Sequence, residues 1–226
     1  MGRRRMGKQT TNSVSHRPSR RDTMISAGAA FLTTSFFPCL AHAGKTATQF
    51  IEKLGEESIL QLADPDISNR ERERRFRVLL EENFDTARIS RFVLGHHARN
   101  VTPEQMAEIT RLYMEVAVLT YAHLFASYAG QGFKVIREVG MPGDRYIMVL
   151  TEIQPTDGKA AVKLDWQIRV EGDSYAVVDI QVEGASMAIT QREEYTAVLD
   201  RSGGDIPDLL AQLRAKVENL RSDRTD

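Results

Sequence analysis

Residues 161–186 read A-V-K-L-D-W-Q-I-R-V-E-G-D-S-Y-A-V-V-D-I-Q-V-E-G-A-S, and this stretch decides the fold. Apolar and polar residues alternate over 162–170 and again over 178–182, and the polar residues 171–174 separate the two runs. A period of two indicates strands with one buried and one solvated face. The stretch therefore predicts a β-hairpin whose apolar face must be covered by other parts of the chain.

The sequence on either side of the hairpin predicts further strands and the helices that could cover it. Strands are expected over residues 133–139 and 145–154, and each is followed by a turn with proline and glycine. Helices are expected over residues 46–62, 68–82, 85–94 and 102–129, and C-terminal helices are broken at Gly203-Gly204. This order predicts an α+β fold, with helices on one face of a curved antiparallel sheet of about four strands.

The helix expected over residues 102–129 is the longest. Thr102 as N-cap, Pro103 at the first helical position and Gln105 two residues later form a strong helix start, and Ser68 with Glu71 predicts a second capping box. The long helix is apolar over more than one face, which indicates two apolar neighbours. One is the sheet, and the other is either further helices or a bound apolar ligand.

Charge is distributed unevenly along the 226 residues. Residues 1–43 hold seven of the 30 Lys and Arg residues but one of the 31 acidic ones, so the remainder carries a formal net charge of −7. An acidic body argues against a nucleic-acid partner, which requires a basic face for the phosphates. It argues equally against tight electrostatic docking on anionic lipid surfaces.

The first 43 residues have the pattern of an export signal. Arg20-Arg21 precede an apolar run over residues 25–40, and Ala41-His42-Ala43 form a small-x-small cleavage pattern. We expect a signal peptide over 1–43 cleaved after Ala43, a single domain over 44–220 and a polar tail over 221–226. The twin arginines are compatible with both the folded-protein (Tat) route and the ordinary Sec route. The single cysteine, Cys39, lies inside the segment to be removed.

The sequence offers little catalytic chemistry. It contains no phosphate-binding glycine loop, HExxH, nucleophile elbow or CxxC. The acidic residues Asp165, Asp179 and Glu183 are expected on the solvated face of the hairpin. The adjacent pair His96-His97 is a poor metal site by itself, because neighbouring side chains point in different directions. We therefore expect no enzyme activity, no cofactor and no metal.

One segment carries a resemblance to a known family. Residues 179–186, D-I-Q-V-E-G-A-S, followed by Arg192, resemble the D-x-x-V-E-G-x-S…R signature of the MlaC family. These periplasmic phospholipid-shuttle proteins were first named for toluene tolerance. Weaker matches keep the same order along residues 48–220: R-F-V-L-G at 91–95, T-P-E-Q at 102–105, Thr120-Tyr121 and Gly203-Gly204.

The resemblance implies a function in lipid transport. In this family a deep apolar cavity takes the acyl tails and leaves the headgroup in solvent. Members carry phospholipid in the periplasm between an outer-membrane lipoprotein–porin complex and an inner-membrane ABC transporter with an MCE-domain subunit, which maintains outer-membrane lipid asymmetry. A related branch is associated with hopanoid lipids, and that alternative stays open. Structural roles are implied for Glu183, Gly184, Ser186 and Arg192, with a bend at Gly184 and pairing of Arg192 with Glu183 or a nearby carbonyl.

Burying two acyl chains of about sixteen carbons involves on the order of 25 kcal/mol, at about 0.8 kcal/mol per CH₂, so the cavity must cover most of both tails. The candidate lipid-binding residues are Phe92, Val116, Leu119, Tyr121, Leu124, Phe125, Ile136, Val149, Trp166, Ile168, Ile180 and Val182. Two other classes of function remain. One is an exported enzyme with a ketosteroid-isomerase-like cone fold, which requires a carboxylate or histidine that points into the cavity. The other is a chaperone-like module with a groove for polypeptide.

Overall fold

The computed structural model describes residues 46–141, 143 and 145–223. The signal peptide expected over 1–43, its cleavage after Ala43 and the last residues of the polar tail lie outside the described residues. The α+β fold is confirmed: helices precede and follow an antiparallel sheet of four long strands and one short one, in the order β1-β2-β3-β4-β5.

The helices before the sheet agree closely with the predicted ranges. They are α1 (Ala47–Leu62), α2 (Asn69–Asn83), α3 (Thr86–Val93) and α4 (Pro103–Tyr121), with 3₁₀ turns η1 (Gly95–Asn100) and η2 (Ala122–Tyr128). The strands are β1 (Gly132–Gly140), β2 (Tyr146–Gln154), β3 (Val162–Glu171), β4 (Ser174–Val182) and β5 (Ala185–Ser186). The C-terminal helices are α5 (Met187–Arg201) and α6 (Ile206–Ser222).

The helix starts follow the local capping signals. Thr102 and Gln105 form the predicted capping box at the start of α4, and Thr46 and Gln49 form another at α1. The box predicted at Ser68 is only half formed. Ser68 accepts a hydrogen bond from the backbone N–H of Glu71, but the Glu71 side chain bonds to arginines one turn further along α2.

The helix predicted over 102–129 is shorter than expected. The α-helix ends at Tyr121, and the chain continues as the tighter 3₁₀ turn η2, a common way for a helix to close. The change of direction brings Phe125 of η2 against Phe76 of α2, with ring centroids 5.4 Å apart. The apolar residues that extended the pattern past Tyr121 therefore lie on a separate turn.

The central hairpin differs from simple alternation at one point. Trp166 pairs with Ile180 and Ile168 pairs with Val177, so β4 carries an extra residue at Val178. Such a bulge shifts the phase of the side chains that follow it. As a result Val177, which the alternation had placed on the polar face, is fully buried in the core.

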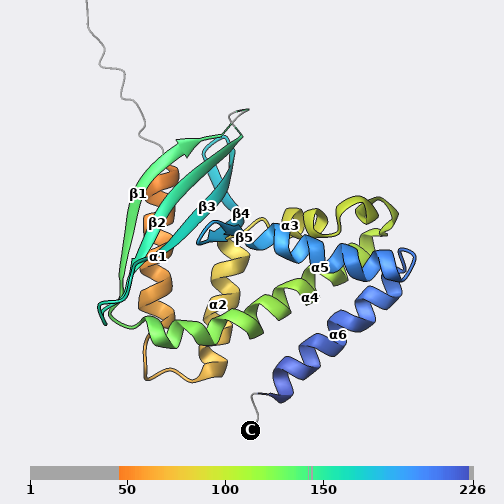
Figure 1. Ribbon diagram of the computed structural model, residues 1–226. Coiled ribbons are helices and arrows are strands. Elements are labelled where there is room, and N and C mark those ends of the chain that lie inside the picture. Colours follow the sequence, from red (N-terminus) through yellow and green to blue (C-terminus); the bar gives the residue numbers. More distant parts are fainter. Residues whose placement is uncertain (1–45, 142, 144, 224–226) are drawn as a thin grey trace, which may run out of the picture. The chain divides into compact units, whose positions relative to one another are not determined.

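Two large apolar clusters result from this arrangement, together with a small one of Leu80, Met114 and Val118 between α2 and α4. The helical cluster lies among α3, α4, α5 and α6, and its members include Ile109, Leu112, Leu199 and Leu209. The sheet cluster joins α1 and α2 to the inner face of the sheet through residues such as Ile51, Val149 and Ile168. Figure 1 shows α1 lying along the sheet, α3, α5 and α6 beyond its β4–β5 edge, and α4 running from these helices to the region below α1 and α2.

Residues 179–186, which carry the family resemblance, connect β4 of the sheet to helix α5. Glu183 and Gly184 have φ values of 50° and 83° and form the two-residue turn between β4 and β5, where glycine is favoured. The Glu183 carboxylate accepts a hydrogen bond from the backbone N–H of Lys163 at 2.7 Å. Ser186 then caps α5 by accepting from the N–H of Ile189 at 3.0 Å. The segment therefore closes β4 and starts α5.

Two expectations about this segment are wrong. Asp179 does not lie on a solvated face, because it is only 8% exposed and accepts hydrogen bonds from the Ser186 hydroxyl at 2.6 Å and the Ala188 N–H at 2.9 Å. Arg192 does not pair with Glu183. Its guanidinium lies 4.9 Å from the centroid of the Phe92 ring, in a cation–π contact between α5 and α3.

Candidate functional site

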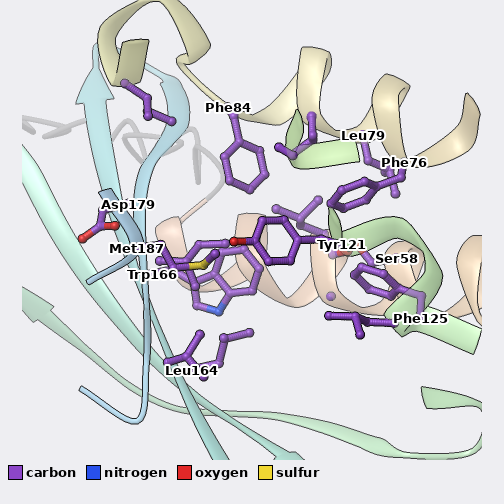
Figure 2. A pocket seen from close by; sticks show the side chains of 18 of the residues that line it. Ser58, Phe76, Leu79, Phe84, Tyr121, Phe125, Leu164, Trp166, Asp179 and Met187 are labelled. Atoms are coloured by element: carbon purple, nitrogen blue, oxygen red, sulfur yellow. Dashed lines mark hydrogen bonds between the residues drawn. The ribbon is translucent and has the colours of Figure 1, made fainter. Parts of the chain in front are cut away.

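An apolar pocket of about 450 Å³ lies between the inner face of the sheet and helices α1, α2, α4 and α5. Its wall is largely aromatic and aliphatic, and Figure 2 shows Phe76, Phe84, Tyr121, Phe125 and Trp166 around the same space. Several of these rings also contact one another. Phe76 and Phe125 are 5.4 Å apart, and Phe133 meets Trp166 edge-on at 6.5 Å.

The indole N–H of Trp166 has a hydrogen-bond partner within the protein. The indole N–H of Trp166 donates to the Thr151 hydroxyl at 3.1 Å, and that hydroxyl donates to the Leu164 carbonyl at 2.6 Å. Burying an unpaired donor is costly, so this short chain of bonds allows Trp166 to lie in the wall. The indole therefore contributes apolar surface to the pocket.

The few polar side chains of the lining are mostly bonded as well. The Ser58 hydroxyl donates to the Leu54 carbonyl at 2.6 Å, and the Tyr113 hydroxyl donates to Gln191 Oε1 at 2.5 Å. Burial raises the pKa of the Tyr113 hydroxyl well above its ordinary value, so it stays neutral. Asp179 is the acidic residue of the lining, and within the described residues the lining has no Lys, Arg or His.

If the pocket were an active site, Asp179 would be the candidate general base. A general base requires an oxygen within hydrogen-bond reach of a substrate proton. Both carboxylate oxygens of Asp179 already accept hydrogen bonds, from Ser186 and Ala188 at the first turn of α5. The carboxylate thus stabilises the helix N-terminus, where negative charge is favourable.

The structure brings six of the twelve candidate lipid-binding residues together. Tyr121, Leu124, Phe125, Trp166, Ile180 and Val182 line the pocket. Leu124 and Val182 are 43% and 37% exposed, which marks the mouth of the pocket between η2 and the end of β4. That these six residues bind lipid remains a prediction.

The other six candidates lie elsewhere. Val116 and Leu119 are buried in the helical cluster, on the side of α4 that faces α6 and away from the sheet. Val149 and Ile168 are fully buried in the sheet cluster. Phe92 is exposed under Arg192, and Ile136 is exposed at a bulge in β1. Periodicity identified these residues as apolar, but it did not distinguish a dry core from a pocket wall.

Sequence reasoning missed the part of the wall that α1 and α2 supply. These residues are Leu54, Gly55, Ser58 and Ile59 from α1, and Phe76, Leu79 and Leu80 from α2. The apolar stripes of both helices were visible in the sequence. Nothing local indicated that the stripes faced an open space.

The two adjacent histidines form a separate cluster. His97 Nε2 lies 2.8 Å from Asp200 Oδ1, and the rings of His96 and His97 have centroids 3.9 Å apart. Possible metal-ligand atoms of these three residues lie within 4.8 Å of one another. The cluster joins η1 to the end of α5 and shares no residue with the pocket lining.

Comparison with known proteins identifies the family. A model of the MlaC protein family matches residues 48–215. The chain belongs to the MlaC family. The fold of this MlaC-family protein is similar to that of a phospholipid-binding protein from Ralstonia solanacearum, solved in complex with a phospholipid. The two are 20% identical with a TM-score of 0.69, over 78% of this chain and 99% of the other.

Two further findings concern this MlaC-family protein. Among curated proteins, none matches the chain. Within residues 46–141, 143 and 145–223, no helix combines the length and apolar character needed to cross a bilayer.

Proposed function

We propose that this MlaC-family protein is a periplasmic carrier that binds phospholipid by its acyl tails and moves it between membrane complexes. The observation that carries the proposal is the pocket between sheet and helices. Its wall is apolar, its polar groups are largely bonded within the protein, and its volume of about 450 Å³ suits a small-molecule ligand. Such a wall favours hydrocarbon tails over a charged or strongly polar substrate.

Family membership supports the direction of this proposal. The similarity of the fold to a protein that binds phospholipid makes the same class of ligand the first candidate. The acyl tails would contact Tyr121, Leu124, Phe125, Trp166, Ile180 and Val182, with the headgroup at the mouth beside Leu124. The proposed partners are the outer-membrane lipoprotein–porin complex and the inner-membrane ABC transporter with its MCE-domain subunit. Shuttling between them would maintain outer-membrane lipid asymmetry.

Native mass spectrometry of the protein purified from the periplasm tests lipid binding. We expect a bound diacyl phospholipid that organic extraction releases and tandem mass spectrometry identifies. A hopanoid in its place would assign the protein to the related branch. Protein that is free of lipid, and that takes up none from phosphatidylglycerol vesicles, would contradict the carrier function.

Export has its own test. We propose that residues 1–43 direct export and that cleavage follows Ala43, so N-terminal sequencing of the periplasmic form should begin at Gly44. A full-length cytoplasmic product would contradict this. Replacing both Arg20 and Arg21 by lysine should abolish export if the folded-protein route is used, and should leave it unchanged if the Sec route is used.

A further inference from the structure

The pocket wall contains a half-buried phenol that the protein itself does not satisfy. Among the described residues, the Tyr121 hydroxyl has no hydrogen-bond partner, whereas the hydroxyls of Ser58 and Tyr113 are both bonded. Burial raises the pKa of the Tyr121 hydroxyl, with a further contribution from the Glu194 carboxylate. In Figure 2 the hydroxyl points into the pocket, toward the side where Trp166 and Met187 lie. The hydroxyl keeps some access to water, and a lipid that displaces this water leaves it without a partner unless the lipid supplies an acceptor.

The position of Tyr121 along the wall indicates which part of a lipid it meets. Tyr121 ends α4, one turn before the exposed mouth residue Leu124. Leu79 of α2 is 4% exposed and belongs to the closed part of the same wall. Tyr121 therefore lies at the junction between the mouth and the interior. In a glycerolipid the ester carbonyls occupy the same junction, between the tails and the headgroup.

The charges around Tyr121 favour a neutral acceptor. Asp179 belongs to the same wall and the described lining has no basic residue, while the Glu194 carboxylate lies 3.9 Å from Lys216 Nζ, outside the lining. A phosphate placed here would meet negative charge without a compensating cation. An ester carbonyl is neutral and accepts a hydrogen bond from a phenol without this repulsion.

We propose that the Tyr121 hydroxyl donates a hydrogen bond to an ester carbonyl of the bound glycerolipid, and that this bond makes the pocket select ester-linked over ether-linked lipids. The inference rests on the proposed carrier function and refines its substrate class. It assigns Tyr121 a role in specificity beyond its contribution to the apolar wall.

A competition between two lipids with the same headgroup and the same tail length tests the proposal. The protein is incubated with vesicles that contain equal amounts of dipalmitoyl phosphatidylglycerol and its dihexadecyl ether analogue, and native mass spectrometry measures the ratio bound. We expect the wild type to prefer the ester roughly threefold to tenfold, the usual range for one net hydrogen bond. Tyr121→Phe should lower this preference to about one.

A control variant and a variant of a competing residue lose the same oxygen atom at other places. Tyr175 stacks on Phe50 outside the pocket lining, and Tyr128 lines the pocket on the last turn of η2. Tyr175→Phe should keep the wild-type preference, Tyr128→Phe tests the other phenol of the wall as a competing donor, and circular dichroism checks that every variant is folded. The wild-type measurement requires no variant, so the proposal remains testable if Tyr121→Phe fails to fold.

The outcomes separate this inference from the carrier function. A wild type that binds both lipids equally, or a Tyr121→Phe variant that keeps the ester preference, would overturn the role of Tyr121 and leave the carrier function intact. If Tyr121→Phe weakens both lipids equally, the hydroxyl bonds to the phosphate, which the two lipids share. Loss of the preference in Tyr128→Phe alone would assign the bond to Tyr128. A wild type that binds neither lipid would contradict the carrier function itself.

Discussion

The helical cluster and the pocket are built from the same kinds of side chain, yet one is closed and the other is open. In the helical cluster Ile109 and Leu199 are fully buried among α3, α4, α5 and α6. Between the sheet and α1, α2 and α4, residues such as Phe76 and Leu164 leave about 450 Å³ unfilled. A dry interior packs to the density of an organic crystal, whereas the wall of an empty space lacks attractive contacts on one side. The helical cluster therefore stabilises the fold, whereas the pocket wall leaves one side free for the proposed ligand.

The largest contrast is expected between two isoleucines on the inner face of the hairpin. Ile168 is 0% exposed in the sheet cluster, whereas Ile180 is half-buried and lines the pocket. Ile168→Asp buries an unpaired carboxylate and should cost more than about 4 kcal/mol, enough to unfold a domain of ordinary stability. Ile180→Asp should stay folded and lose its lipid, because the carboxylate draws water into the pocket.

Circular dichroism and lipid extraction distinguish the two isoleucine variants. If Ile180→Asp keeps its full complement of lipid, Ile180 does not contact the ligand. If Ile180→Asp unfolds as Ile168→Asp does, Ile180 belongs to the dry core, and the contrast between core and pocket fails at this position.

A matched pair of leucine truncations sharpens the comparison along one continuous stretch of chain. Leu112 of α4 is 2% exposed in the helical cluster, and Leu124 of η2 is 43% exposed at the pocket mouth. Leu112→Ala should lower the free energy of unfolding by about 2–5 kcal/mol through the cavity it leaves. Leu124→Ala should lower it by less than about 1 kcal/mol but reduce lipid retention. Urea unfolding of lipid-free protein measures the loss of unfolding free energy in both variants, and native mass spectrometry measures lipid retention. Equal losses of unfolding free energy would show that the mouth is packed as tightly as the core.

Asp179 lies where the two regions meet, in the pocket wall and at the start of α5. Asp179→Ala removes the acceptor for Ser186 and Ala188 and should cost about 1.5–3 kcal/mol, the range for hydrogen bonds to a charged group. Ser186→Ala is the matched control, with an expected cost of about 1 kcal/mol from the lost N-cap. Because the two residues share one bond, the double variant should lose less than the sum of the two. Additive losses in urea unfolding would rule out the coupling.

A small effect on stability is expected for Gly55→Ala, because Gly55 of α1 lies in the pocket wall. A Cβ on Gly55 would lie 2.4 Å from Cε1 of Phe133, so alanine must displace that ring. Overpacking costs about 1–3 kcal/mol, and the helix propensity of alanine offsets about 1 kcal/mol. We therefore expect a net loss of about 0–2 kcal/mol together with reduced lipid binding, because the ring moves into the pocket. The double variant Gly55→Ala with Phe133→Leu should restore lipid binding. If Gly55→Ala alone binds lipid as the wild type does, the Phe133 ring moves elsewhere.

Local patterns predicted most of the secondary structure. Alternation over residues 162–170 identified β3, and Thr102 with Gln105 located the start of α4, because side-chain period and capping depend on neighbours within one or two turns. The same patterns failed at Val177 and Tyr121. A bulge in β4 and a tightening of the helix into η2 changed the direction of the chain there, and no local pattern of residues marked either one.

The sequence by itself determined an α+β protein with an apolar sheet face, helices to cover it, and the family signature around Asp179, Glu183 and Ser186. Only the tertiary structure decided which apolar residues became core and which became pocket wall. Ile168 and Ile180 share one face and one chemistry, but Ile168 is fully buried in the sheet cluster whereas Ile180 borders the pocket. The tertiary structure also turned Asp179 from an expected surface acid into the buried partner of the first turn of α5. Burial is a property of segments far apart in sequence that meet in space, so no single segment encodes it.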